Sequence, residues 1–403
     1  MTTLTAAHDA ALKQRVQRRL IERVDTASGT PAEMRAHLRE LLRDEEPLLV
    51  SSRFERMLDE LVDEVGGLGP LEPFLADASI TEVMINGPGR AYVERNGRLE
   101  QIALNLDAAA IVRLVERVVA PLGLRLDRAS PMVDARLADG SRLHAVIPPL
   151  AVDGPCVTIR RFGARAVPLD AFGLGSHAAA FLEWVVAAGW NVLVAGGTSA
   201  GKTTLLNALS AGIPSGERIV TIEETAELRL AQPHVVRLEA RPANAEGAGE
   251  VSVRALVRAA LRMRPDRVVV GEVRGGEALD MMQALNTGHE GSMSTIHANG
   301  TGDALARLET LTLLADSGLP LAAVRSQLAA SVDVVVHVAR RAGGIRQVEA
   351  IAEVVDDGSL DGHRARVRPL FVLGPSGLCP VDAPQRPARR PGTPSIELGW
   401  FGC

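Results

Sequence analysis

The strongest restriction on how this chain can fold comes from eight consecutive residues, Gly196–Thr203, which read Gly-Gly-Thr-Ser-Ala-Gly-Lys-Thr. They follow the apolar run Asn191–Ala195 and lead into a stretch typical of a helix, Lys202–Leu209. A strand, a glycine-rich loop and a helix in this order form a phosphate-binding loop, the Walker A motif. The glycines let successive backbone N–H groups converge on phosphate oxygens, and the helix N-terminus adds partial positive charge. We therefore expect an α/β nucleotide-binding core.

The side chains of this loop have distinct expected roles. Lys202 would reach the β- and γ-phosphates of a nucleotide, and the Thr203 hydroxyl would bind Mg²⁺. The alternative, a glycine-rich turn with only a structural role, is disfavoured by the spacing and by the flanking strand and helix. The residues predicted to bind nucleotide here are Gly196, Gly197, Thr198, Ser199, Ala200, Gly201, Lys202, Thr203 and Thr204.

A candidate base for ATP hydrolysis follows the apolar run Arg267–Gly271. A hydrophobic strand that delivers an acid at its C-terminal end is typical of the Walker B position. Gly271 stands where aspartate is usual, so Glu272 is the expected water-orienting base. The alternative is an ordinary glutamate at a strand end.

The missing acid has a candidate in the segment Thr221–Glu227, at the end of the predicted strand Arg218–Ile222. Its adjacent carboxylates, Glu223 and Glu224, are costly to hold side by side without a cation. A nucleotide-bound Mg²⁺ would supply that cation. A solvated acidic turn is the alternative.

Two histidines, His289 and His297, flank the predicted strand Ser292–Ile296. In a parallel sheet this strand would bring the segment near the γ-phosphate, where it could sense the nucleotide state. A zinc site is disfavoured because neither a cysteine nor a third histidine shares the spacing. Taken alone, two structural histidines are the default interpretation.

Composition argues against several classes of protein. The net charge of −5 and the 3% aromatic content over 403 residues disfavour dedicated nucleic-acid binding. The N-terminus lacks the apolar core of a signal peptide, and the most apolar window, Phe181–Gly197, is interrupted by Glu183. The three cysteines have neither metal-ligand nor disulfide spacing. We expect a cytoplasmic protein without a transmembrane segment, attached to a membrane only through a partner.

The sequence predicts that the chain has five parts, two of which are folded domains. Short alternating strand patterns indicate a compact α+β domain, and apolar strands alternating with helical stretches indicate a RecA-like sheet covered on both faces. The expected parts are a helical extension at 1–65, an α+β N-terminal domain at 66–162, a linker at 163–175, a RecA-like ATPase domain at 176–372 and a disordered, proline-rich tail at 373–403.

The two ends of the chain allow more than one interpretation. Leu12, Val16, Leu20 and Val24 recur every four residues and predict one apolar helix face. Such helices could form a small bundle, a partner-docking arm or a solvated helical extension. The aromatic end of the tail could be a docking peptide, although an unused tail is the preferred interpretation.

Four segments in a fixed order resemble one family. They resemble the Walker A motif, Asp-box, Walker B motif and His-box of the secretion-superfamily ATPases, which drive type II secretion, type IV pili and type IV conjugal transfer. The upstream segments Pro131–Arg142 and Ile147–Phe162 are similar to the tight-adherence (Flp) pilus branch. The resemblance covers about residues 65–355. Its four segments are Gly196–Thr203, Thr221–Glu227, Leu261–Glu272 and Thr287–His297.

The resemblance implies further roles for individual residues. Glu223 would assist Mg²⁺, Glu272 would activate water, and the His-box would contribute His289 and His297 to catalysis. The arginines implied to contact phosphates, some across a subunit boundary, are Arg262, Arg142, Arg160 and Arg161. Three departures are Glu224 in place of aspartate, His144 in place of asparagine, and Gly123-Leu124-Arg125 where the branch carries two arginines after the glycine.

The resemblance also implies a function. We expect a homohexameric ATPase that uses ATP and Mg²⁺ to drive Flp pilus assembly or type II/IV secretion. It would bind an inner-membrane platform protein at the inner face of the cell membrane and make no direct contact with nucleic acid. The alternatives are a conjugal-transfer ATPase, a RecA-like nucleic-acid motor and a nucleotide switch that does not hydrolyse ATP.

Overall fold

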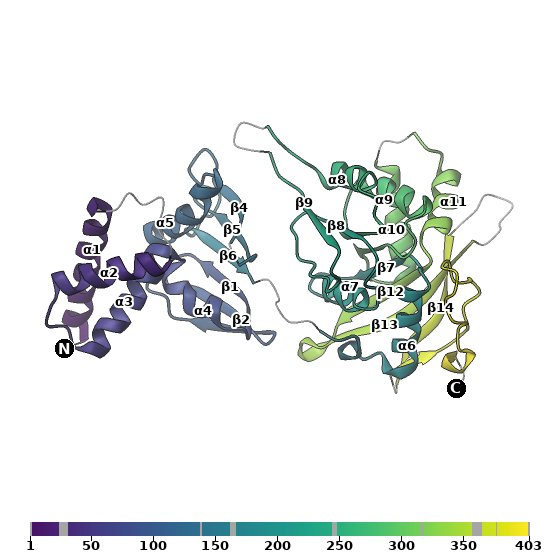
Figure 1. The fold of residues 1–403 in the computed structure, drawn as a ribbon, viewed down its shortest axis with the longest axis horizontal. Coiled ribbons are helices and arrows are strands. Elements are labelled where there is room, and N and C mark those ends of the chain that lie inside the picture. The colour runs from purple at the N-terminus through teal and green to yellow at the C-terminus, as the bar shows by residue number, and fades with distance from the viewer. Residues whose placement is uncertain are drawn as a thin grey trace. The chain divides into compact units, whose positions relative to one another are not determined.

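A computed structural model describes residues 2–23, 31–137, 139–161, 167–243, 248–315, 318–356, 365–375 and 377–401 (Figure 1). The chain divides into two compact units, Met1–Gly163 and Ala164–Cys403. The expected helical extension and α+β domain therefore fall in one unit, and the expected ATPase domain falls in the other. The part of the chain described here contains no helix that is long and apolar enough to span a bilayer.

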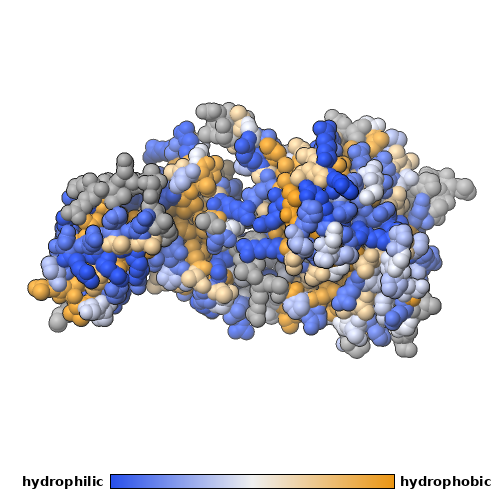
Figure 2. Space-filling view, in the orientation of Figure 1, coloured by the Kyte–Doolittle hydropathy of each residue, from blue (hydrophilic) through white to orange (hydrophobic). Residues whose placement is uncertain are grey.

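The first unit begins with three helices that share an apolar core. α1 buries Leu12, Val16 and Leu20 against leucines of the next two helices. The predicted apolar face is thus confirmed as far as Leu20, while Val24 lies outside the described residues. Hydrophilic side chains cover much of these helices in the face shown in Figure 2. The helices are α1 (Thr2–Arg23), α2 (Pro31–Glu45) and α3 (Ser51–Gly66).

The rest of this unit is an antiparallel sheet with the order β3-β2-β1-β6-β5-β4 in the described residues. Alternate side chains of each central strand, such as Val83 and Ile85, are buried beneath α5. This alternation is expected for a sheet with one packed face. The elements are η1 (Gly69–Leu71), α4 (Glu72–Ala76), β1 (Ile80–Asn86), β2 (Ala91–Arg95), β3 (Arg98–Ile102), α5 (Ala108–Val119), η2 (Ala120–Leu122), β4 (Met132–Arg136), β5 (Arg142–Val146) and β6 (Cys156–Arg160).

The second unit contains a larger mixed sheet with the order β15-β14-β13-β12-β7-β11-β10-β8-β9 in the described residues. The strands from β12 to β9 in this order are parallel, and β13, β14 and β15 extend the sheet in antiparallel fashion. The strands are β7 (Val192–Gly196), β8 (Ile219–Glu223), β9 (Val235–Glu239), β10 (Arg267–Val273), β11 (Met293–His297), β12 (Val334–Arg340), β13 (Arg346–Asp356), β14 (Ala365–Gly374) and β15 (Gly377–Pro380).

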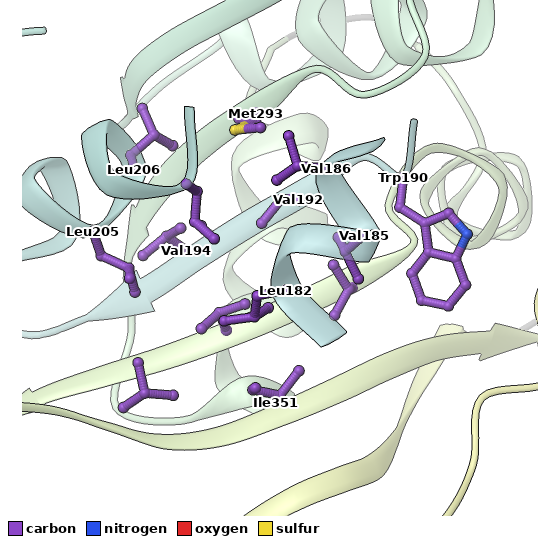
Figure 3. Close-up of a cluster of buried hydrophobic side chains, with 14 of the residues drawn as sticks. Leu182, Val185, Val186, Trp190, Val192, Val194, Leu205, Leu206, Met293 and Ile351 are labelled. Atoms are coloured by element: carbon purple, nitrogen blue, oxygen red, sulfur yellow. The ribbon is translucent and has the colours of Figure 1, made fainter. Parts of the chain in front are cut away.

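Helices cover both faces of this sheet, as the predicted RecA-like core requires. On one face, α6 and α7 pack side chains such as Leu182 and Leu205 against Val194 of β7 (Figure 3). On the other face, a second apolar core lies under α8–α11. The helices are η3 (Leu169–Phe172), α6 (Gly175–Ala187), α7 (Lys202–Ser210), α8 (Val253–Ala260), α9 (Glu277–Asn286), α10 (Thr301–Leu313), α11 (Leu321–Ser331), η4 (Ala342–Gly344) and η5 (Leu398–Phe401).

The described part of the expected linker differs from the sequence prediction. Residues 167–175 include η3, and the side chains of Phe172 and Leu174 are buried in the core of the second unit. The turn signals Pro168 and Gly173 flank this short helix and do not mark a free connection. Residues 163–166 of the expected linker lie outside the described residues.

The C-terminal segment also differs from the disordered tail that its prolines suggested. β15 adds a strand to the sheet, and the Trp190 indole donates a hydrogen bond to Pro387 O at 2.9 Å. The ring of Phe401 packs 5.5 Å from that of Phe181. The proline content was a poor guide because the partners of the segment are core residues distant in sequence.

Three arginines of this segment neutralise buried carboxylates of the second unit. Arg389 donates to both carboxylate oxygens of Asp333 at 2.6 and 2.8 Å, and Arg386 Nη1 lies 2.8 Å from Asp333 Oδ1. Arg390 pairs with Glu217. Because Asp333 is fully buried, the segment supplies charges that this unit needs.

Candidate nucleotide-binding site

The predicted motifs meet at one edge of the second sheet. His297 at the end of β11 lies in register with Gly196 at the end of β7, and β10 and β8 end at the same edge with Glu272 and Glu223. In parallel sheets, ligands bind beyond the carboxyl ends of the strands. The topology therefore assembles Walker A, Walker B and part of the His-box in one place.

The backbone of the predicted phosphate loop needs its glycines. A Cβ added at Gly196 would lie 2.4 Å from Val338 O of β12, so only glycine fits between the two strands. Gly201 has a φ of 95°, in the left-handed region, and directly precedes α7. Thr198 and Ser199 are exposed. The loop thus presents its tip to solvent beside the N-terminus of α7, an arrangement suited to phosphate binding.

Lys202 is a buried cation with neutral neighbours. Its Nζ donates to Gly197 O at 3.0 Å and lies 3.3 Å from His297 Nε2. Burial lowers the pKa of the ammonium group. Among the described residues, no carboxylate lies within ion-pair distance of it. A buried charge without a counterion is costly, so this position fits a phosphate anion.

Glu272 lies at the centre of a chain of polar contacts. Its Oε2 accepts a 2.7 Å hydrogen bond from Arg274, which also donates to Glu224 at 2.8 Å. Its Oε1 lies 2.8 Å from His297 Nε2 without hydrogen-bond geometry, so it is a buried oxygen with no hydrogen bond in the described structure. One oxygen is thus fixed and the other retains the capacity to accept from water.

His297 joins the lysine and the glutamate of the site. Its ring lies within 3.5 Å of Lys202 Nζ on one side and 2.8 Å from Glu272 on the other. Burial, followed by the nearby Lys202 charge, lowers the pKa of His297. The neutral imidazole is therefore favoured between the two charges. This contact brings the end of the segment Thr287–His297 next to Lys202 and Glu272.

Glu223 fills the space beside Gly271. A Cβ at Gly271 would lie 2.7 Å from Glu223 Cγ and 3.2 Å from its Oε2. The Glu223 carboxylate accepts hydrogen bonds from the backbone N–H groups of Glu227 at 2.7 Å and Leu228 at 3.0 Å. Burial nevertheless raises the pKa of Glu223 to about 7. A carboxyl group in this state fits Mg²⁺, because a nearby cation favours its ionised form.

Two predicted site residues of the second unit lie elsewhere. His289 precedes β11, and its Nδ1 lies 3.0 Å from Ala284 O. Arg262 is exposed between α8 and β10. Both therefore lie toward the N-terminal ends of strands that rise about 3.3 Å per residue. Within one subunit, His289 and Arg262 are therefore separated from Lys202, which follows the C-terminal end of β7. Each motif begins before a strand and ends at or near that strand's last residue, so its two ends lie at opposite edges of the sheet.

The predicted arginines of the first unit divide into two kinds. Arg142 and Arg160 are directly opposite each other on β5 and β6, and Arg160 pairs with Glu82 at 2.7 Å. Arg161 instead donates to the backbone carbonyl groups of Asp77 and Ile80. It therefore fixes the start of β1, and its guanidinium group is already engaged.

Sequence reasoning missed two polar residues that organise the site. Arg274 connects Glu272 to Glu224, and its position two residues after Glu272 was the available signal. Asn191 directly precedes β7, is buried, and accepts from the N–H groups of Gly291 and Ser292 at 3.0 and 3.1 Å. It ties the start of β7 to the loop before β11, and a strand-flanking asparagine carries no such signal.

Comparisons with known proteins show which proteins this chain resembles. A family model described as "Type II/IV secretion system protein" matches residues 64–360. A putative conjugal transfer protein of Mycobacterium tuberculosis is 46% identical over 303 residues, covering 72% of this chain and 86% of that protein.

A second relative and one solved structure extend the comparison. The type IV secretion system protein PtlH of Bordetella pertussis is 39% identical over 313 residues, covering 68% of this chain and 90% of that protein. The structure of the Legionella pneumophila ATPase DotB matches with a TM-score of 0.51 and 19% identity, covering 69% of this chain and 78% of that one. This likeness supports the fold alone.

Proposed function

The chain belongs to the type II/IV secretion system protein family, and we propose that it is a hexameric motor that hydrolyses ATP. The observation that carries the proposal is the group formed by Lys202, His297 and Glu272 at the end of the phosphate loop. It places a cation for phosphate beside a carboxylate suited to orient water.

Lys202 and the loop backbone would bind the phosphates of ATP. The Nζ contact with Gly197 O and the contact with His297 would be exchanged for phosphate oxygens, which are stronger partners for an ammonium group. Mg²⁺ bound with the nucleotide supplies further positive charge to the phosphates. Thr203 and Glu223 are the residues that would hold it, directly or through water.

Glu272 would orient the attacking water and accept its proton. Arg274 fixes one carboxylate oxygen, so the other is held toward the interior of the site. His297 touches both Lys202 and Glu272, and loss of the lysine contact on phosphate binding would change the surroundings of the imidazole. This contact supports a role for His297 in reporting nucleotide state.

Arginines of the first unit support the proposed ring. Arg136, Arg142 and Arg160 are cross-strand neighbours on β4, β5 and β6. Three guanidinium groups in one row suit an anion with several oxygens, such as a phosphate. We propose that this row contacts a nucleotide phosphate of the same subunit or of its neighbour in a homohexamer. Such head-to-tail contacts close into rings.

Two kinds of observation, sequence motifs and relatives, bear on the process that the proposed motor would drive. The sequence motifs between Pro131 and Phe162 favour Flp pilus assembly, with an inner-membrane platform protein as the partner at the inner face of the cell membrane. The relatives described as conjugal transfer and type IV secretion proteins favour secretion as the second candidate. Neither function requires direct contact of this chain with nucleic acid.

The sequence offers a simple test of the ATPase proposal. Lys202→Ala should abolish phosphate release while leaving the circular dichroism spectrum unchanged. Lys13 is the only other lysine and pairs with Glu60 and Glu64 in the first unit, so Lys13→Ala is the matched control. Normal turnover in folded Lys202→Ala would refute the assignment. Stimulation of turnover by single-stranded DNA would favour a nucleic-acid motor.

A further inference from the structure

A hairpin outside the predicted motifs reaches the edge that carries the phosphate loop. β12 runs parallel to β7, with His337 in register with Ala195. It continues to Arg340, which pairs with Arg346 across the turn at the start of β13. Because β7 ends at Gly196, this hairpin extends beyond the same edge as the nucleotide loop (Figure 1).

The side chain of Arg346 lies against Gly201 of the phosphate loop. A Cβ added at Gly201 would be 2.6 Å from Arg346 Cδ and 3.3 Å from its Nε. The aliphatic part of the arginine therefore passes directly over a position that only glycine leaves open. Gly201 is also the residue before the first turn of α7, where the backbone N–H groups point outward.

The charge of Arg346 is not used within the described structure. Its side chain is exposed, and its guanidinium group has neither a hydrogen bond nor an ion pair to any described residue. Arg341 in the same hairpin provides a contrast, because its guanidinium group lies 2.7 Å from Glu349. Within this hairpin, Arg341 is thus neutralised, whereas the charge of Arg346 is available beside the loop.

We infer that Arg346 is a nucleotide-binding residue that donates to the phosphates from the side of the β12–β13 hairpin. The inference rests on the proposed ATP site. In this type of loop the glycine-rich backbone cradles the α- and β-phosphates, and the lysine reaches the β- and γ-phosphates. An arginine packed on Gly201 is therefore placed for the α- and β-phosphates, where its planar fork suits two oxygens at once.

Placement at the α- and β-phosphates predicts a particular kinetic effect. ADP and ATP share these groups, so loss of Arg346 should weaken both nucleotides equally. Loss of an interaction made equally with the substrate and the transition state raises KM and leaves kcat unchanged. Glu272 and Lys202 act on the γ-phosphate side, and their loss should lower kcat.

The experiment compares Arg346→Met with Arg341→Met in the full chain. Methionine retains an unbranched apolar stem over Gly201 and removes the charge. Affinity for fluorescently labelled ADP and ATP should fall roughly 10- to 100-fold in Arg346→Met, which is the loss of a charged hydrogen bond, and should change little in Arg341→Met. Arg346→Lys should recover part of the affinity.

Each other outcome has a distinct meaning. Equal affinities in Arg346→Met and the wild type would overturn the inference and leave the ATP site standing. Equal losses in both hairpin variants would show that only the overall charge of the hairpin matters, which also overturns a specific contact. Failure of the wild type itself to bind ADP or ATP would refute the proposed function. This outcome is distinct because the proposed function does not depend on Arg346.

Discussion

The side chain of Glu223 occupies the space next to the Gly271 backbone that any larger residue at 271 would need. A Cβ there would lie 2.7 Å from Glu223 Cγ. The two residues are on adjacent strands, β8 and β10, whose residues Ile222 and Val270 are in register. A carboxylate on one strand is therefore accommodated by the absence of a side chain on the other.

Gly271→Asp is expected to destabilise the second unit by about 1–3 kcal/mol, the usual cost of overpacking a well-packed region. The double variant Gly271→Asp/Glu223→Ala should recover most of this loss, because it removes the colliding group. Thermal unfolding measures both. Gly216→Ala is the control, since no atom lies within 4 Å of its added Cβ. Equal destabilisation of the single and double variants would contradict a steric conflict between residue 271 and the Glu223 side chain.

The raised pKa of Glu223 predicts a pH-dependent loss of stability. Between its ordinary value near 4.5 and about 7, the unfolded chain releases a proton that the folded chain retains, so stability falls as the pH rises through this window. A shift of this size corresponds to about 3 kcal/mol, fully lost above pH 7. In Glu223→Gln this contribution should vanish in denaturant unfolding measured from pH 4.5 to 8. An unchanged pH profile would assign the dependence to other groups.

Glu272→Gln should separate binding from chemistry. The amide retains the shape of the side chain but no longer accepts a proton, so ATP affinity should persist and turnover should fall by 10²-fold or more, roughly the contribution of a general base. Phosphate release and equilibrium ATP binding measure the two effects. Glu100→Gln, an exposed substitution in the first unit, serves as the control. Weak binding with normal turnover would assign Glu272 to the metal or to structure.

The ring proposal predicts rescue between two inactive variants. Arg160→Ala lacks a proposed phosphate contact and Lys202→Ala lacks the loop lysine. In a mixture, some interfaces should pair an intact arginine with an intact loop, so specific activity should exceed that of either variant alone. Wild-type activity per subunit should also rise with protein concentration. Activity that is independent of concentration, with no gain on mixing, would indicate a self-sufficient monomer.

The C-terminal arginines predict a stability effect in the second unit. Arg389→Leu leaves Asp333 with fewer counterions in a fully buried position, at a cost of about 3 kcal/mol. Adding Asp333→Asn should reduce the loss, because the buried charge is removed. Chemical denaturation of the single and double variants measures the coupling. Additive effects would show that the pair does not interact.

Local signals in the sequence predicted where the proposed phosphate loop and Glu272 lie in the fold. Gly196–Thr203 and Glu272 are each defined by a strand and the residues that directly follow it, and strand ends determine where such residues lie. His297 lies at the end of β11, as its position after an apolar run suggested. His289 lies apart from His297 because it precedes β11 (Met293–His297), and the strand carries the chain to the other edge of the sheet.

Contacts between distant segments were not predictable. The ion pair of Arg389 with Asp333 joins residues 56 positions apart, and nothing in the composition of the tail reveals a buried partner. The contact of Arg346 with Gly201 depends on the register between β12 and β7, which follows only from the assembled sheet. Strand and helix patterns in the sequence identify the elements. Which distant charged residues pair with each other becomes known only from the tertiary structure.

The docking of the C-terminal segment restricts how this protein can be recombined with its relatives. The matching charges belong to different parts of the chain, with Arg386, Arg389 and Arg390 at one end and Asp333 and Glu217 within the sheet. A chimera that joins this core to another C-terminus would leave Asp333 without its two arginine counterions and Glu217 with Arg267 alone. In a chimera, the C-terminal segment and the rest of the second unit should therefore be taken from the same protein.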